Sequence, residues 1–312
     1  ALKVGDNATV TLVFSETVYS FSSSADITVP NGTLATMTSS DNITWTRTFT
    51  PTANTEDVSN TLSLATSYTD TAGNEGSVAT TANYEVDTLV PSVSSFTLSD
   101  TALKVGENAT VSLVFSEAVA SFSSSADITV ANGTLATMTS TDNITWTGTL
   151  TPPVNTEDAS NTLSLATSYT DTIGNPGPAA TTANYEVDTL APTVKSFTLS
   201  DTALKAGDNA TVKLVFSEAV VSFSSSADIT VANGTLTTMT SSDNITWSRI
   251  FTPTVDTEDA SNTLSLATSY TDTAGNAGPT ATTLNYEVDT LAPSVNSFTL
   301  SDTALKAGDN AT

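Results

Sequence analysis

The residues of this chain that could do chemistry are almost all acidic. Asp and Glu number 33 against 8 Lys and Arg, Cys and His are absent, and the formal charge is −25. Without Cys or His, the chain cannot form disulfides, thiolate or imidazole metal sites, a Cys nucleophile or a Ser-His-Asp triad. Carboxylate, Asn amide and backbone carbonyl oxygens remain, and these are the ligands of calcium. The negative charge argues against nucleic acid as a partner, because phosphate binding requires Lys and Arg.

The sequence is built from near-identical copies. Residues 1–101 recur as residues 102–202 and again as residues 203–303. A catalytic pocket needs to be built only once, whereas tandem copies provide length, valency or a surface repeated at fixed spacing. We therefore predict that the protein is not an enzyme. No apolar run approaches the ~20 residues of a membrane span, so we expect no direct membrane insertion of this segment.

Within a copy, short runs of β-branched and aromatic residues alternate with turn clusters, which is typical of a β-sandwich. Residues 9–14 place Val10, Leu12 and Phe14 on one face. The Asn31-Gly32 pair is a strong hairpin signal, and residues 51–60 are expected to form a loop. The pattern predicts an all-β fold of tandem immunoglobulin-like antiparallel β-sandwiches in a linear array.

The domain boundaries are predicted from the first strand of the sandwich. Residues 95–98 follow Pro91 and alternate correctly, so they are expected to be the first strand of the second domain. The predicted domains are residues 1–88, which lack their own first strand, residues 90–189, residues 191–290, and residues 291–312, which begin a fourth repeat with its first strand.

Strand direction decides which loops share an end of the sandwich. The loops predicted at the N-terminal pole are residues 15–25, 39–42 and 70–77. The opposite pole takes the turn between the first two strands, the Asn31-Gly32 turn, residues 51–60 and the exit at Asp87. In a tandem array, the C-terminal pole of each copy meets the N-terminal pole of the next. Acidic residues of neighbouring copies should therefore converge at each junction.

The converging oxygens could form calcium sites, because six to eight oxygen ligands describe a calcium shell. At the first junction the candidates are Glu56, Asp57, Asp87, Glu117, Asp171 and Asn175. At the second they are Glu157, Asp158, Asp188, Glu218, Asp272 and Asn276. Without a cation such a cluster is repulsive, and with calcium it becomes a rigid clamp. The alternative is that these acids simply solvate turns, as Asp and Asn commonly do.

Several motifs of the third copy, considered together, resemble a known family. They are Ser217-Glu218-Ala219-Val220, residues 228–234, Thr246-Trp247, residues 270–276 and residues 288–293. The pattern is similar to the bacterial Ig-like extender repeats of giant, calcium-dependent, type I-secreted adhesins of the RTX type, and it covers all three copies. The resemblance implies an extracellular stalk anchored at the outer membrane, calcium at the domain junctions, and a role in cell adhesion and biofilms.

Two other functions compete with a stalk. In a self-assembling filament, residues 297–300 would complete the first domain of another chain by β-strand complementation. A carbohydrate-binding array would need exposed aromatic residues. The tryptophans, which are Trp45, Trp146 and Trp247, fall on the inward parity and are expected in the core.

Overall fold

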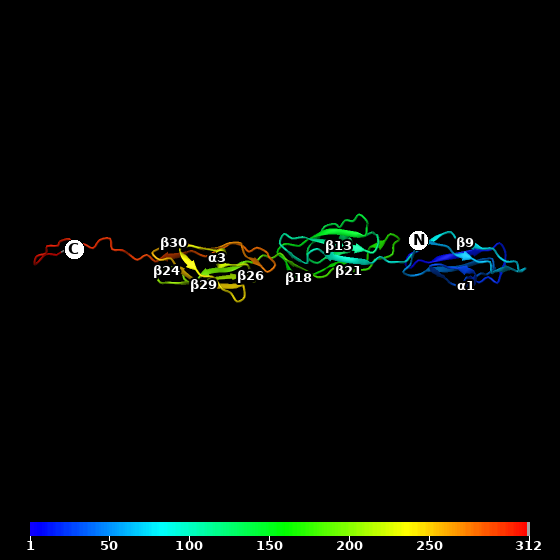
Figure 1. Cartoon of the computed structure of the whole chain (residues 1–312), viewed down its shortest axis with the longest axis horizontal. Coiled ribbons are helices and arrows are strands. Elements are labelled where there is room, and N and C mark those ends of the chain that lie inside the picture. The colour runs from blue at the N-terminus through cyan, green and yellow to red at the C-terminus, as the bar shows by residue number, and fades with distance from the viewer. Residues whose placement is uncertain (311–312) are drawn as a thin grey trace. The chain divides into compact units, whose positions relative to one another are not determined.

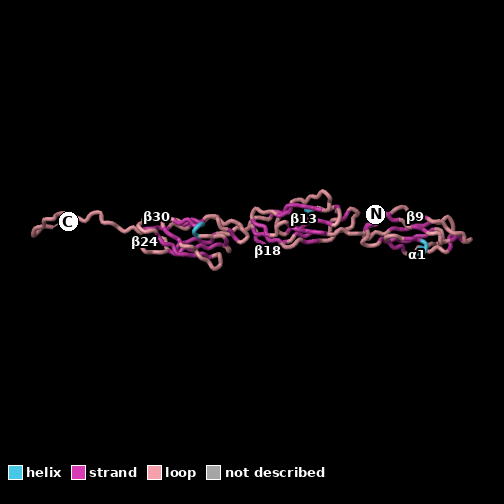
Figure 2. Tube along the Cα trace, viewed as in Figure 1, coloured by secondary structure: helices cyan, strands magenta, loops and turns pink. Residues whose placement is uncertain are grey.

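Each repeat forms its own β-sandwich in the computed structural model, which describes residues 1–310 (Figures 1 and 2). Every sheet takes its strands from a single repeat. Among these residues, helix is limited to one four-residue turn in each repeat, namely α1 Ser23–Asp26, α2 Ser124–Asp127 and α3 Ser225–Asp228. No helix in the described part of the chain is long and apolar enough to span a bilayer. The chain divides into two compact units, Ala1–Pro153 with Glu157–Val187, and Val154–Thr156 with the residues from Asp188 onward.

The strands recur in the same order in each repeat. In the first they are β1 Ala8–Val13, β2 Val18–Tyr19, β3 Ile27–Thr28, β4 Gly32–Leu34, β5 Thr44–Pro51, β6 Glu56–Asn60, β7 Ser63–Leu64, β8 Thr69–Asp70, β9 Ala79–Thr80 and β10 Tyr84–Asp87. In the second they are β11 Val93–Leu98, β12 Ala102–Lys104, β13 Ala109–Phe115, β14 Val119–Ala120, β15 Ile128–Val130, β16 Thr134–Leu135, β17 Thr145–Thr151, β18 Glu157–Asn161, β19 Leu163–Leu165, β20 Thr170–Asp171, β21 Ala180–Thr181 and β22 Tyr185–Asp188. In the third they are β23 Val194–Leu199, β24 Ala203–Lys205, β25 Ala210–Phe216, β26 Val220–Val221, β27 Ile229–Val231, β28 Gly234–Leu236, β29 Thr246–Pro253, β30 Glu258–Asn262, β31 Leu264–Leu266, β32 Thr271–Asp272, β33 Ala281–Thr282 and β34 Tyr286–Asp289.

The second repeat shows the complete sandwich. One layer is the sheet β11-β13-β17-β16, and the other consists of the sheets β12-β22-β18, β15-β19-β21 and β14-β20. The core lies between them, where Leu113 and Leu150 of the first layer join one cluster with Leu165 and Val187 of the second. The third repeat has the same strand order, and this architecture confirms the predicted fold class.

Strict alternation of side chains produces this core. Val111, Leu113 and Phe115 of β13 are all buried, as the pattern predicted for the corresponding residues of the first repeat. Successive strand residues point to opposite faces, so an apolar residue at every second position gives one buried face and one solvent-exposed face. In the first repeat, the equivalent Val10 and Leu12 are only half-buried.

The free edge of β1 explains that difference. In the second and third repeats, β11 and β23 pair antiparallel with β13 and β25 and lie at the edge of the sheet. In the first repeat the sheet order is β1-β5-β4, so β1 is itself the edge among the described strands. Residues 291–310 belong to no strand.

The predicted hairpin at Asn31-Gly32 is wrong. β3 pairs with β7 whereas β4 pairs with β5, so the chain passes from one layer to the other between them. Asn31 does adopt a positive φ of 50°, which the sequence pair allows. A Cβ atom on Gly32 would lie 2.1 Å from the ring of Phe49, so glycine is required there for close packing.

The loop predicted at residues 51–60 is also partly wrong, because it contains β6. This strand pairs antiparallel with β10, and Glu56 lies opposite Asp87. Only Asn60 of its five residues is buried. A strand that is polar at nearly every position carries no alternation signal, so the sequence pattern could not reveal it.

Candidate functional site

The loops meet at the poles as strand direction predicts. In the second repeat, Val119 of β14 pairs with Asp171 of β20. This pairing brings the loop before β14 and the loop after β20 to the same end of the sandwich. The backbone N–H of Val119 also donates to the carbonyl of Asn143, which adds the loop before β17. At the opposite pole of the first repeat, the Thr88 hydroxyl donates to the carbonyl of Thr52 over 2.6 Å. The exit strand and the loop before β6 therefore share one end.

A buried asparagine connects the first repeat to the second. The side chain of Asn175 is fully buried. Its Oδ1 atom accepts the backbone N–H of Val4 at 2.8 Å, and its Nδ2 atom donates to the carbonyl of Asp87 at 2.9 Å. The same Nδ2 atom donates to Asp171 Oδ2 at 2.7 Å. One amide thus holds two separate segments of the first repeat against a loop of the second.

The loop that carries Asn175 is shaped by Asp171. Asp171 Oδ1 accepts the backbone N–H groups of Ile173, Gly174 and Asn175 at 2.9, 2.6 and 2.9 Å. Gly174 has a φ of +101°, which L side chains rarely adopt. The Lys3 ammonium donates to the Gly174 carbonyl over 3.4 Å. Asp171 therefore preorganises the loop from within, and Lys3 of the first repeat adds a contact to it.

Two carboxylates at this contact, those of Asp87 and Glu117, have raised pKa values. Burial raises the pKa of Asp87, and the neighbouring charges of Asp171 and Glu56 raise it further. Burial likewise raises the pKa of Glu117, with added repulsion from Asp171, Asp87 and Glu56. Each raised pKa means that the ionised group is held at an electrostatic cost. A bound cation or proton would remove that cost.

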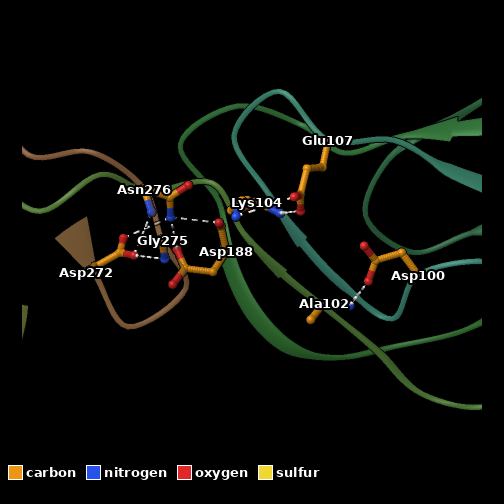
Figure 3. A network of polar contacts seen from close by, with 8 residues as sticks. All are labelled: Asp100, Ala102, Lys104, Glu107, Asp188, Asp272, Gly275 and Asn276. Atoms are coloured by element: carbon orange, nitrogen blue, oxygen red, sulfur yellow. Dashed lines mark hydrogen bonds and ion pairs between the residues drawn. The ribbon is translucent and has the colours of Figure 1, made fainter. Parts of the chain in front are cut away.

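The equivalent residues between the second and third repeats lie still closer. Carboxylate oxygens of Asp188, Glu218 and Asp272 are within 4.8 Å of one another, and Asp272 is fully buried. The Asn276 amide donates to the Asp188 carbonyl at 2.9 Å and to Asp272 Oδ2 at 2.8 Å. Figure 3 shows Asp188, Asp272 and Asn276 turned toward one another, with Asp272 also accepting the backbone N–H of Gly275 over 2.7 Å.

The first repeat provides an internal comparison for these loops. Its Asn74 amide donates to Asp70 Oδ2 at 2.6 Å, which reproduces the contact inside the later loops. This hydrogen bond is the main reason that the pKa of Asp70 is lowered. Yet Asn74 is exposed, whereas Asn175 and Asn276 are buried. The loop conformation is intrinsic to each repeat, and the burial is added by the exit strand of the preceding repeat.

Not all of the predicted ligands turn toward the junctions. Asp57 Oδ2 accepts the amide of Asn31 at 2.7 Å, and Asp158 Oδ2 accepts the amide of Asn132 at 2.8 Å. These two aspartates therefore tie together their own repeats. Glu56 faces Asp87 across the β6–β10 pair. The remaining residue of the predicted set, Glu157, begins β18.

Sequence reasoning missed the part played by the backbone. The N–H of Val4 and the carbonyls of Asp87 and Leu89 all bond to Asn175, the last at 3.5 Å. Because backbone N–H and carbonyl groups occur at almost every residue, the side-chain pattern does not show which of them bind an asparagine. The Asp-x-x-Gly-Asn motif at residues 171–175 was the available signal; it identified the receiving loop, and strand direction placed Asp87 beside it, but the backbone partners were not predicted.

The tryptophans are partly buried and pack against the core clusters of their repeats. The Trp146 ring packs 4.8 Å from that of Phe122, which in turn contacts Tyr169. Within residues 1–310, the indole N–H groups of all three tryptophans are buried without a hydrogen-bond partner; they belong to Trp45, Trp146 and Trp247. Each indole therefore contributes to the packing of its sandwich, with its N–H group on the buried side.

Comparison with known families decides the identity of the repeats. Residues 1–86, 87–187 and 188–288 each match the family described as the bacterial Ig-like domain. The chain belongs to this family. A comparison with curated proteins finds no match.

Solved structures similar to this chain include two bacterial proteins, an adhesin and an integrin-binding protein. The Escherichia coli adhesin FdeC is 13% identical with a TM-score of 0.36, over 92% of this chain and 93% of that one. Invasin, a bacterial integrin-binding protein, is 11% identical with a TM-score of 0.31, over 84% of this chain and 56% of that one. The I9–I11 tandem of titin is 7% identical with a TM-score of 0.29, over 93% and 95%. None of these similarities transfers a function.

Proposed function

We propose that the chain is an extender segment of a bacterial cell-surface adhesin, an extracellular stalk that holds a distal binding domain away from an outer-membrane anchor. The observation that carries the proposal is the repetition of one inter-repeat contact between near-identical bacterial Ig-like domains. Asn175 binds the exit strand at Asp87, and Asn276 binds the exit strand at Asp188. A contact copied from one junction to the next propagates along an array, which is what a spacer requires.

The dimensions of the repeat suit a spacer. Strands of about seven residues rise ~3.3 Å per residue, so each repeat with its loops would add roughly 40 Å to the stalk. The linker Asp188-Thr189-Leu190-Ala191-Pro192 is short, and proline restricts the residue before it to extended conformations. The strong negative charge would keep long arrays soluble and apart.

We further propose that calcium rigidifies the junctions. The ligands would be Asp188, Glu218 and Asp272 at one junction, and the equivalent Asp87, Glu117 and Asp171 at the other. Support comes from the 4.8 Å grouping of the first three carboxylates and from the raised pKa values of Asp87 and Glu117. Carboxylates repel one another unless a cation or a proton lies between them, and backbone carbonyls and water would complete the oxygen shell.

Burial of the loop aspartates supports this proposal over the simpler hypothesis of solvated turns. Asp70 occupies the same loop position in the first repeat and is partly exposed, whereas Asp171 and Asp272 are buried. Hydrogen bonds from the backbone and from the Asn175 amide already compensate Asp171 in part, and a cation would add to that compensation. Burying a charge is unfavourable unless hydrogen bonds or a counter-ion compensate for it.

The test measures the melting temperature and the maximum particle dimension by small-angle scattering, in millimolar calcium and in a chelator. At a calcium concentration of one hundred times Kd, each site should add about 2.7 kcal/mol of stability. Asp188→Ala should abolish the response of its junction. Asp289→Ala is the matched control, because Asp289 ends β34, the same strand of the third repeat.

The possible outcomes separate the two parts of the proposal. If neither quantity responds to calcium, and Asp188→Ala behaves like Asp289→Ala, the carboxylates are solvated turns and the calcium mechanism is wrong. A compact particle in both conditions would contradict the stalk itself.

A further inference from the structure

A short parallel ladder joins the early part of the first repeat to its last strand. Leu2 pairs in parallel with Val86 of β10. The Leu2 N–H donates to the Glu85 carbonyl at 2.9 Å, and the Asp87 N–H donates to the Leu2 carbonyl, also at 2.9 Å. In the second repeat β12 and β22 are likewise neighbours, and in the third β24 lies parallel to β34. The ladder is therefore a property of the repeat.

A side chain of the second repeat completes this ladder in the first. The bonds of a parallel ladder are evenly spaced and alternate between the two strands, so the next one would run from the Val4 N–H to the Asp87 carbonyl. The Asn175 amide lies between these two groups instead. Its Oδ1 atom accepts the Val4 N–H at 2.8 Å, and its Nδ2 atom donates to the Asp87 carbonyl at 2.9 Å. The amide thus takes the place of a peptide group at the end of the ladder.

The end of the ladder fits a carboxamide better than a carboxylate. It offers one donor, the Val4 N–H, and one acceptor, the Asp87 carbonyl, and a primary amide can bond to both. A carboxylate has no hydrogen to donate, and its charge would lie beside Asp171, whose Oδ2 atom accepts the same Nδ2 group at 2.7 Å. Asn175 is fully buried, so a group left unpaired there would pay the full cost of its lost water.

The direction of the two strands decides how the ladder responds to a pull. Leu2 lies early in the repeat and Val86 near its end, and the two segments run parallel. A pull on the two ends of the repeat therefore draws them past each other lengthwise, and every hydrogen bond between them is loaded at once. Antiparallel neighbours joined by a tight turn would instead open one bond at a time. The two bonds of Asn175 share the load of the ladder that they complete.

We propose that the end of this ladder is a binding site for the carboxamide of the following repeat, and that Asn175 thereby locks the first repeat against unfolding by tension. The bond to the exit strand recurs one repeat further on, where the Asn276 amide donates to the Asp188 carbonyl at 2.9 Å (Figure 3). The resistance of a repeat to force is then set in part by its C-terminal neighbour. This carboxamide lock needs neither bound calcium nor an outer-membrane anchor, so its failure would leave those proposals standing.

The test is unfolding of the full chain at constant force, held by peptide tags at its two ends, in chelator. The chain has no cysteine. A disulfide between Thr9→Cys and Thr48→Cys, which lie opposite each other on β1 and β5, therefore shortens the unfolding step of the first repeat alone and identifies it in every variant. Asn175→Ala removes the two short bonds of the carboxamide lock. It should raise the unfolding rate of the labelled repeat about 5- to 150-fold at a given force.

Two further variants make the test specific. Asn175→Asp keeps the shape of the side chain but loses its donor, and it should accelerate the labelled step at least as much as Asn175→Ala. Asn276→Ala makes the same change one repeat further on and should leave the labelled step at the parent rate. The unlabelled steps show, in the same molecule, that the other repeats are folded. The proposal is overturned if the labelled step keeps the parent rate in either Asn175 variant, or if Asn276→Ala accelerates it equally.

Discussion

Replacing Asn175 by alanine should weaken the contact between the first two repeats by an amount that can be worked out in advance. The two shortest hydrogen bonds from the side chain to the preceding segments are neutral, from the Val4 N–H and to the Asp87 carbonyl, whereas those to Asp87 Oδ1 and the Leu89 carbonyl are long, at 3.4 and 3.5 Å. The bond to Asp171 stays within the loop. A neutral hydrogen bond contributes about 0.5–1.5 kcal/mol, so losing two should cost about 1–3 kcal/mol.

Asn74→Ala isolates that quantity. Asn74 makes the same bond within its loop, to Asp70, and is exposed. Both variants lose the loop bond, so the difference between them reports the contact between repeats. Two such substitutions should be nearly additive, because they lie in different repeats and share no partner.

The assay is hydrogen exchange followed by mass spectrometry, on the segment that contains Val4. Its N–H is protected by Asn175 itself. A loss of 1–3 kcal/mol should accelerate its exchange about 5- to 150-fold in Asn175→Ala, at roughly tenfold per 1.4 kcal/mol. Asn74→Ala should leave it unchanged. If both variants exchange at the parent rate, the asparagine does not hold the repeats together and the reasoning fails.

Two further predictions concern pH and the core. Because the folded-state pKa values of Asp87 and Glu117 are raised from 3.8 and 4.5, the folded state holds more protons than the unfolded state just above those values. In chelator, protection at the first junction, after correction for the slower intrinsic amide exchange at low pH, should therefore rise as the pH is lowered from 7 to 5, and calcium should abolish that gain; a fall in corrected protection would contradict the sign. Leu113→Ala removes a fully buried side chain and should cost about 2–5 kcal/mol in denaturant unfolding. Leu12→Ala, at the half-buried equivalent position, should cost less, and equal losses would show that the free edge of β1 does not loosen the core.

The alternating strands could be predicted because their signal is local. Val111, Leu113 and Phe115 alternate with less buried residues, and a two-residue period gives their shared face without knowledge of any partner. β6, which spans Glu56–Asn60, could not be predicted in the same way. It is stabilised by its ladder with β10, and a polar strand on the surface has no apolar period to detect.

Part of the candidate site could likewise be predicted from the sequence, and part could not. Strand direction is enough to bring the loop at residues 171–175 to the pole that faces the preceding repeat. It does not say which acids turn toward the junction. Glu56 and Asp57 are adjacent on β6, and neighbouring strand residues point to opposite sides. Only Glu56 lies opposite Asp87, whereas Asp57 accepts hydrogen bonds from Asn31.

The sequence by itself determined the repeat, the all-β class, the acidic charge and the end of the sandwich at which each loop lies. These follow from composition, from a two-residue period and from counting strand directions, all of which are properties of the chain read in order. Only the tertiary structure decided that Asn175 is buried while Asn74 is exposed, although the two loops have nearly the same sequence. The physical reason is that the burial of a side chain depends on the segment that packs against it: a side chain loses its water only when another part of the fold covers it.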